Sequence, residues 1–222
     1  MILERTKAQT KELYKPLDDY LDRVRKKIRS EFNHLSLAGF DRLNVIQTRQ
    51  MTQDAFDRID AFNKTEYARL VRHAWLWACR RVKKRPHDIS YPDYVLEYLN
   101  GYDPVTGYIY TQELDRKRMR LNEGIMAARE FNDRNAFEKA VKKTADLLYT
   151  QSMQYGTDLM QAAMLEVYER AGIDELMWVS VMDGRECDEC HDRNGVVYKR
   201  KEYPGKPHYG CRCYPVPVVR IP

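Results

Sequence analysis

Four of the five cysteines lie in the C-terminal part of the chain, at spacings that suit a metal site. Cys187 and Cys190 form a C-x2-C pair, and His208 and Cys211 form an H-x2-C pair. Each pair places two ligands on one tight turn, and two such turns facing one another supply the four tetrahedral ligands that Zn2+ prefers. The spacing therefore predicts a zinc site formed by these four residues.

Cys213 is an alternative to Cys211, because residues two apart on an extended segment point the same way. His191 follows Cys190 directly but lies off the knuckle spacing. Four protein ligands leave no open coordination position, so the predicted site is structural rather than catalytic. Such a site contributes folding energy to a segment too small to fold alone. The competing interpretation is that these cysteines are reduced thiols without a metal.

Composition favours a globular protein made and folded in a cytoplasm. The chain has 222 residues, of which 43% are hydrophobic and 32% are charged. No apolar run approaches the about 20 residues that a transmembrane helix needs, and the N-terminal residues do not resemble a signal peptide. Cytoplasmic thiols stay reduced, which favours a metal over disulfides for the clustered cysteines. The net charge of +5 is mild, so it permits contact with nucleic acid without requiring it.

The first two-thirds of the chain show helical periodicity. Pro16 suits the first turn of a helix, and Gly39 suits a break after it. Further helices are predicted over roughly 52–62, from Thr65 to the basic cluster before Pro86, over about 112–130 and over about 135–171. Their apolar residues recur every three to four positions. The N-terminal part is therefore predicted to be an elongated helical body.

Short β-strands are predicted after this body. Gly172 stands where a glycine ends the long helix, and residues 177–182 and 196–198 are rich in β-branched and aromatic residues. The prolines after Tyr214 keep the tail extended. We therefore expect a mainly α protein with a small C-terminal zinc-stabilised β region, an α+β fold. Its predicted parts are 1–134 and 135–222.

Other candidate features have both a functional and an ordinary interpretation. The basic runs 80–85 and 116–120 suit contacts with phosphates or an acidic partner, but solvated helix ends are favoured. The tyrosines of 91–113 suit either a binding face or packing around a loop or hairpin between helices. Cys79 is predicted to be a small buried residue. Asp183 and its neighbours up to Glu186 are expected to shape a turn rather than to form an acid site.

The C-terminal segment also carries further residues in a characteristic order. They are Trp178 in the predicted strand, Asp183 and Arg185 in a turn, Cys187 and Cys190, Asn194 and Gly195, and the run Pro207-His208-Tyr209-Gly210-Cys211-Arg212-Cys213. Taken together, this string resembles the phage Mu F-like minor head protein family, also called phage head morphogenesis proteins. The resemblance covers about residues 151–218, and the N-terminal 130 residues resemble the family only loosely.

This resemblance implies a non-enzymatic protein present in few copies in the phage head. Such proteins associate with the portal during capsid assembly, and some are thought to contact DNA. The implied partners are therefore the portal protein, the major capsid protein, or both, with packaged DNA as a further candidate; the implied location is the virion. Many members carry Thr-Glu on the long helix where this chain has Thr150 and Gln151. Some also continue into a toxin domain, which is not expected here.

Two other functions compete with this expectation. HNH nucleases combine C-x2-C knuckles with histidines, but they need a further catalytic histidine to activate water. His191 and His208 are the only histidines of the tail, and His208 is already assigned to zinc. A zinc-ribbon DNA-binding protein is the third hypothesis. Its contacts would come from Arg193, Lys199, Arg200, Lys201 and Lys206.

Overall fold

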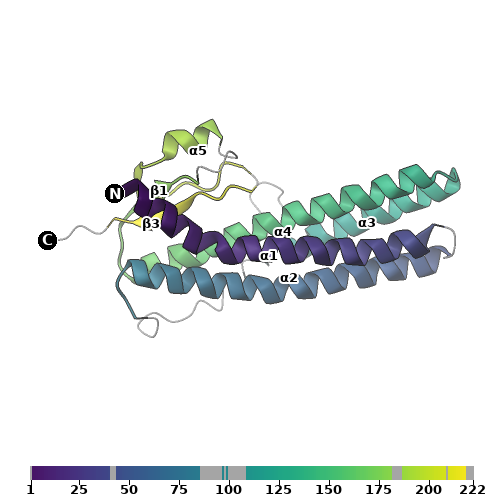
Figure 1. Cartoon of the computed structure of the whole chain (residues 1–222), viewed down its shortest axis with the longest axis horizontal. Coiled ribbons are helices and arrows are strands. Elements are labelled where there is room, and N and C mark those ends of the chain that lie inside the picture. Colours follow the sequence, from purple (N-terminus) through teal and green to yellow (C-terminus); the bar gives the residue numbers. More distant parts are fainter. Residues whose placement is uncertain are drawn as a thin grey trace. The chain divides into compact units, whose positions relative to one another are not determined.

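The computed structural model describes residues 2–40, 44–85, 97, 99, 109–181, 187–208 and 210–218. Long helices come first and a small antiparallel sheet follows, as the α+β prediction expects (Figure 1). The elements are α1 (Ile2–Gly39), α2 (Val45–Arg81), α3 (Tyr110–Glu130), α4 (Arg134–Arg170), β1 (Glu175–Val179), α5 (Asp188–Arg193), β2 (Val197–Lys199), the 3-10 helix η3 (Arg200–Glu202) and β3 (Tyr214–Pro217).

The chain forms two compact units that interleave along the sequence. Residues 1–18, 67–96 and 154–222 make up one unit, called here the sheet unit. Residues 19–66 and 97–153 make up the other, called the bundle unit. Helices α1, α2 and α4 each contribute to both. The sequence-based division at residue 134 is a single cut, whereas each compact unit takes segments from both sides of that position.

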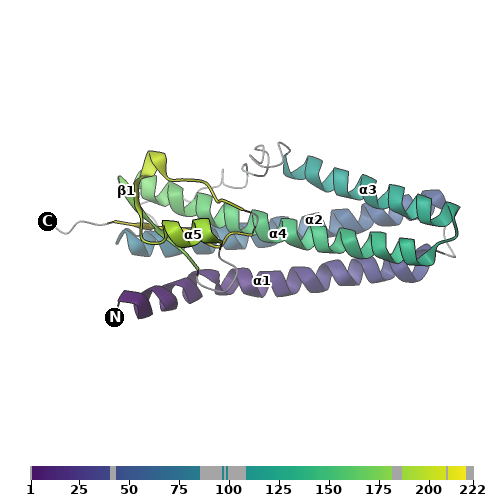
Figure 2. The same cartoon turned by 90° about the horizontal axis from the view of Figure 1, so that it is seen from above.

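The bundle unit is built from four helical segments (Figure 2). Residues on the inner face of α1 recur at helical spacing and are buried, which confirms the periodicity read from the sequence. Helices α3 and α4 approach closely at Gly124, where an added Cβ would lie 3.0 Å from the Cβ of Ala140. The buried apolar residues of the bundle unit include Leu21, Val24, Ile28, Phe32, Leu35, Phe56, Ile59, Leu121, Ile125, Phe137, Val141 and Leu148.

Two predicted helix boundaries are wrong. Pro16 lies inside α1 rather than in its first turn. The separate helices expected at 52–62 and from Thr65 onward are one helix, α2. A helix was expected to start near Thr65, but the hydroxyl of this residue donates to the Ala61 carbonyl one turn earlier, 3.0 Å away. That bond uses the hydroxyl inside a continuous helix, so it does not cap a new one.

The end of α4 leads into the sheet as the sequence predicts. Gly172 has φ of 69°, the left-handed conformation that favours glycine after a helix. The N–H of Ile173 then donates to the Tyr168 carbonyl, at 2.9 Å, which closes the helix end. Strand β1 starts at Glu175, two residues earlier than expected.

The sheet has the strand order β2-β1-β3, and both pairings are antiparallel. Trp178 on the central strand pairs with Pro215 of β3, and Leu176 pairs with Tyr198 of β2. The extended tail predicted after Tyr214 is confirmed as β3. Helix α5 has only six residues and was not predicted.

Tyr214 anchors β3 against the helices of the sheet unit. Its ring is buried and meets the rings of Tyr14 and Trp77 edge-on, with centroids 5.9 Å and 5.7 Å away. Its hydroxyl lies 2.8 Å from the hydroxyl oxygen of Thr10. Next along the strand, the Pro215 carbonyl accepts from the Tyr168 hydroxyl at 3.3 Å. The segment that follows the last cysteine is therefore held by α1, α2 and α4.

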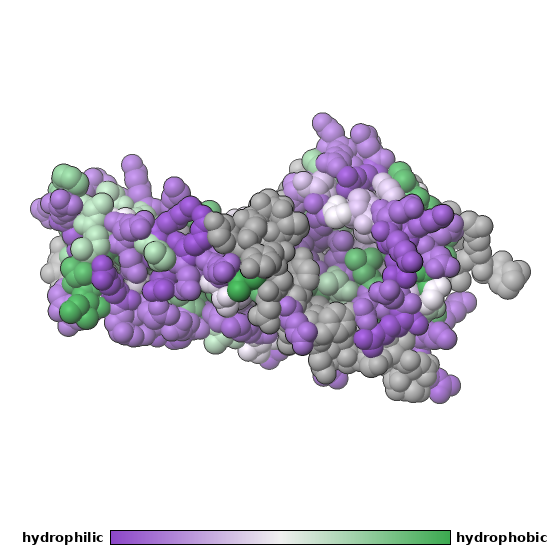
Figure 3. Space-filling model, turned by 180° about the vertical axis from the view of Figure 1, so that it is seen from behind, coloured by the Kyte–Doolittle hydropathy of each residue, from purple (hydrophilic) through white to green (hydrophobic). Residues whose placement is uncertain are grey.

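Several sequence features lie outside the described residues. These include the turn from Asp183 to Glu186 and most of the tyrosine-rich stretch 91–113. Tyr110 is described; it begins α3 and is buried. Among the described helices, none is both long and apolar enough to cross a membrane. On the face drawn in Figure 3, hydrophilic side chains predominate and hydrophobic ones form small separate groups.

Candidate metal centre

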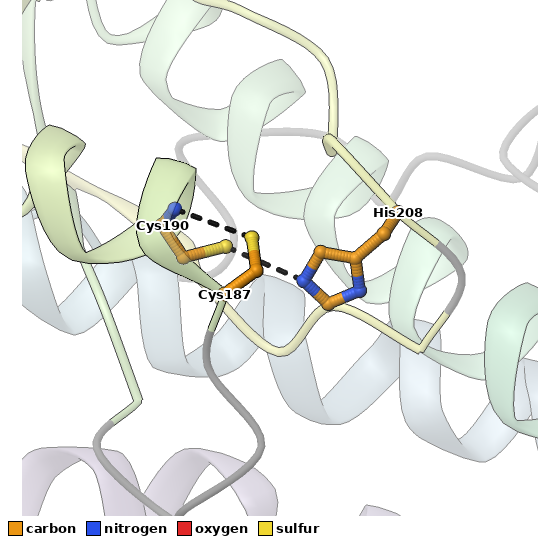
Figure 4. A group of neighbouring side chains, drawn as sticks. All are labelled: Cys187, Cys190 and His208. Carbon is orange, nitrogen blue, oxygen red and sulfur yellow. Dashed lines mark hydrogen bonds between the residues drawn. The ribbon is translucent and has the colours of Figure 1, made fainter.

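The Cys187–Cys190 pair is positioned by the start of α5. Cys187 is the N-cap residue, with extended backbone angles of φ −93° and ψ 166°. Its sulfur accepts the backbone N–H of Cys190 at 3.4 Å, as Figure 4 shows, and its carbonyl accepts the N–H of His191 at 3.0 Å. This capped turn directs both sulfurs to one side. Cys190 is fully buried and Cys187 is partly buried.

The second pair lies on a turn between η3 and β3. The N–H of Cys211 donates to the His208 carbonyl at 3.3 Å. Gly210 has φ of 73°, a left-handed conformation that strains residues with a Cβ. Cys211 and Cys213 are both buried, and His208 is partly buried. Glycine thus permits the tight turn that the H-x2-C spacing needs.

The two turns meet, and they bring all five candidate ligands together. Cys187, Cys190 and His208 form one group, while Cys190, Cys211 and Cys213 form a second. Within each group the ligand atoms all lie within 4.8 Å of one another. The two groups share Cys190, so its sulfur lies within 4.8 Å of ligand atoms from both turns. A cluster of this kind can hold a metal ion.

The distances suit tetrahedral coordination. The Cys190 sulfur lies 3.6 Å from the Cys211 sulfur and 3.5 Å from Nε2 of His208 (Figure 4 shows the latter contact). Zinc–sulfur and zinc–nitrogen bonds of usual length would separate such ligand atoms by roughly 3.5–3.8 Å. All five cysteines are free thiols. Both Cys211 and Cys213 lie with Cys190, so the choice between them stays a prediction, as does the ligand role of each residue.

The buried sulfurs share their protons unequally. A hydrogen bond from the Cys211 thiol lowers the pKa of Cys213 to about 5. The same bond, together with burial, raises the pKa of Cys211. Burial raises the pKa of Cys190 to about 12. Because closely packed thiolates repel one another, a cation is needed to deprotonate them together, and a bound metal provides that charge.

Trp178 packs against the cysteine cluster. It is fully buried with three of the cysteines, and Tyr203 stacks on its ring with a centroid distance of 5.4 Å. Its Nε1 donates to the Ser180 hydroxyl at 3.2 Å, and that hydroxyl donates to the Cys190 carbonyl. The tryptophan strand therefore holds the α5 turn directly. Sequence reasoning missed the roles of Ser180 and Tyr203, because neither residue type signals a metal site.

The other candidate residues lie apart from this cluster or are paired. Cys79 is fully buried, and burial raises the pKa of its thiol, in agreement with its predicted role as a small core residue. Arg80 and Arg81 of the first basic run pair with Glu12 at 2.6 Å and 3.3 Å. Lys117 in the second run pairs with Glu113 at 2.6 Å. These contacts are those of ordinary helix surfaces.

Several basic residues of the tail are also paired with acids. Arg193 pairs with Glu189, and Arg200 pairs with Glu169 at 2.9 Å. Lys199 and Lys201 are exposed. These ion pairs reduce the positive charge available to DNA phosphates, which weakens the case for a zinc-ribbon DNA-binding protein.

The chain was compared with protein families, curated proteins and solved structures. No protein-family model, curated protein or solved structure matches the chain.

Proposed function

We propose that the cluster binds one structural Zn2+ ion through four of its five candidate ligands. The observation that carries this proposal is the meeting of the C-x2-C and H-x2-C turns at Cys190, with ligand-atom separations close to those of a tetrahedral site. Thiolate and imidazole ligands favour zinc over Mg2+ or Ca2+. Four occupied positions leave none for substrate, so the ion stabilises the fold.

Metal analysis of the full chain tests the zinc site, with Cys79 as an internal control. We expect about one equivalent of zinc per chain, as for a closed structural site. Cys190→Ser removes the shared sulfur and should abolish stoichiometric binding, whereas Cys79→Ser changes an equally buried cysteine outside the cluster and should retain it. Wild-type protein without zinc, or equal zinc content in the two variants, would contradict the site.

We further propose that the chain is a non-enzymatic minor head protein of a phage, acting in head morphogenesis. The support is the resemblance of residues 151–218 to the Mu F-like family. The residues that carry it include Trp178, Cys187, Cys190 and the His208–Cys213 run. In this role the helical segments dock on the portal or on the capsid interior, and the zinc site fixes the β region. Contact with packaged DNA is a secondary part of the proposal.

Co-expression with the cognate portal protein, followed by size-exclusion chromatography, tests the docking role. Co-elution at several salt concentrations is expected, and separate elution under all of them would contradict docking to the portal. A parallel plasmid-cleavage assay with Mg2+ or Mn2+ tests the nuclease alternative. Cleavage that His191→Ala abolishes would replace the structural role with an enzymatic one.

A further inference from the structure

A polar side chain from α4 contacts the turn that carries the second ligand pair. The amide oxygen of Gln154 accepts the backbone N–H of Gly210 at 2.6 Å. Gly210 lies between His208 and Cys211, so this bond acts on the backbone that sets their spacing. Gln154 is only 7% exposed. The bond gives the partly buried Gly210 N–H a protein acceptor within the turn.

Gln154 is itself held in place by an acidic residue. Its Nε2 donates to Oδ2 of Asp158, one helical turn further on, at 2.7 Å. That bond fixes which end of the amide faces Gly210, because only the amide oxygen can accept a backbone N–H. The second carboxylate oxygen of Asp158 lies 3.3 Å from Nζ of Lys206. These contacts therefore link Gly210, through Gln154 and Asp158 of α4, to Lys206 in the segment before His208.

Lys206 brings a positive charge to the cluster. Its side chain is 6% exposed, which is rare for lysine unless the charge is paired. Its ammonium group pairs with Asp158, and the lysine precedes the candidate ligand His208 by two residues. Three thiolates and one histidine around a dication carry a net negative charge, and a buried cation nearby offsets it. A buried ammonium group two residues before His208 therefore suits a negatively charged metal–thiolate centre.

We propose that Gln154 is a positioning residue of the metal centre, holding His208 and Cys211 at ligand spacing through the Gly210 N–H. Asp158 orients the glutamine amide and retains Lys206 beside the cluster. This inference rests on the proposed zinc site. Residues that orient metal ligands typically contribute about 10–100-fold to metal affinity, and a similar loss is expected without the Gln154 amide.

Metal affinity of the full chain tests this role, and α4 offers a matched control. Gln151 is also 7% exposed, but neither of its amide atoms has a hydrogen-bond partner among the described residues. Co2+ titration followed by displacement with Zn2+ should show affinity about 10–100-fold weaker in Gln154→Met. Gln151→Met should remain close to wild type. The thiolate charge-transfer bands of bound Co2+ should also change in Gln154→Met alone.

A double variant separates the hydrogen bonds from the bulk of the side chain. Gln154→Glu with Asp158→Asn exchanges the amide and the carboxylate while keeping an acceptor for Gly210 and a donor between the two side chains. Its Zn2+ affinity should exceed that of Gln154→Met because the orienting bonds are kept, and any remaining loss relative to wild type reflects the altered Asp158–Lys206 ion pair. Equal affinities of Gln154→Met and Gln151→Met would overturn the positioning role.

Two further results keep the inference separate from the zinc proposal. If wild-type protein binds neither Co2+ nor Zn2+, the metal centre itself is wrong and the positioning role fails with it. If wild type binds and only the Gln154 comparison fails, the zinc site stands without this support. If the Gln154→Met chain does not fold, amide hydrogen exchange of the wild-type protein still tests the Gln154–Gly210 bond. The Gly210 N–H of metal-loaded wild type should be strongly protected, and fast exchange would contradict its bond to Gln154.

Discussion

Nε2 of His73 lies 3.2 Å from the carbonyl oxygen of Glu12, one helical turn before Pro16. In a regular helix that oxygen accepts the N–H of the fourth residue along, but proline has none. A carbonyl oxygen can only accept, so the imidazole carries its proton on Nε2 and donates it. The α2 side chain thus replaces the bond that Pro16 removes from α1. This relationship explains how a proline lies inside a 38-residue helix.

Removing the imidazole of His73 should reveal how much the missing N–H of Pro16 destabilises the protein. We expect His73→Phe to lower the free energy of unfolding by about 0.5–1.5 kcal/mol, because the Glu12 carbonyl loses this hydrogen bond. In a Pro16→Ala background, residue 16 supplies a helical N–H again, so the same substitution should cost less. Urea denaturation of the four proteins in this double-mutant cycle measures the coupling. Identical costs in both backgrounds would show that His73 does not compensate for the proline.

His73 should also make stability depend on pH. Burial lowers the pKa of His73, and the nearby charge of Arg80 lowers it further, against the opposing effect of the Glu12 carbonyl. The unfolded chain therefore binds a proton more readily than the folded one, and stability present above about pH 6.5 is lost as the pH falls through the folded pKa.

The difference between wild type and His73→Gln isolates this effect from other titrating groups, including the metal ligands. Chemical denaturation at several pH values between about 5 and 8, where histidine usually titrates, gives the free energy of unfolding of each protein as a function of pH. The wild-type free energy of unfolding should decrease more steeply toward acid than that of the variant. Parallel curves would mean that His73 titrates alike in the folded and unfolded chains.

The metal-binding spacing was the most informative part of the sequence. Tight C-x2-C and H-x2-C turns are local, so the spacing alone indicates that each pair shares a turn. That the two turns meet at Cys190 depends on tertiary contacts, above all the packing of Trp178 and Tyr203. Gln154 lies more than 30 residues before the first ligand, and nothing in a buried glutamine of a helix signals a metal site.

The helical body was predicted from its periodicity, and its errors arose where tertiary contacts override local signals. Pro16 suggests a helix start unless a side chain from elsewhere, here His73, satisfies the Glu12 carbonyl. Thr65 suggests a helix start unless its hydroxyl bonds back to Ala61. The interleaving of the two compact units is likewise invisible in composition, since α1, α2 and α4 each run through both without a break signal.

If the proposed zinc ion is bound, chelating it should loosen the sheet unit around Trp178. If zinc is present at about a thousand times its dissociation constant, its removal costs about 4 kcal/mol of stability. Trp178 is fully buried beside the cysteines and stacks on Tyr203, so exposure to water should shift its fluorescence to longer wavelength. Trp75 and Trp77 also emit, and Trp178→Phe is the control that identifies their share. A chelator that leaves both melting temperature and emission unchanged would argue against a structural metal.

A buried amide in the bundle unit supports the last prediction. Asn63 is 2% exposed; its amide oxygen accepts from the Tyr20 hydroxyl at 2.9 Å, and its nitrogen donates to the Ser152 hydroxyl at 3.1 Å. It thereby links α1, α2 and α4.

Asn63→Ala removes both bonds and leaves a small cavity, so we expect the free energy of unfolding to fall by about 2–4 kcal/mol. Asn122→Ala is a milder comparison, because Asn122 is only partly buried and bonds Thr52 at 2.8 Å. Ser152→Ala should cost less than Asn63→Ala, because it removes one bond rather than two. Urea denaturation of metal-loaded protein measures all three. A cost for Asn63→Ala no larger than that for Asn122→Ala would show that this buried amide does not tie the three helices together.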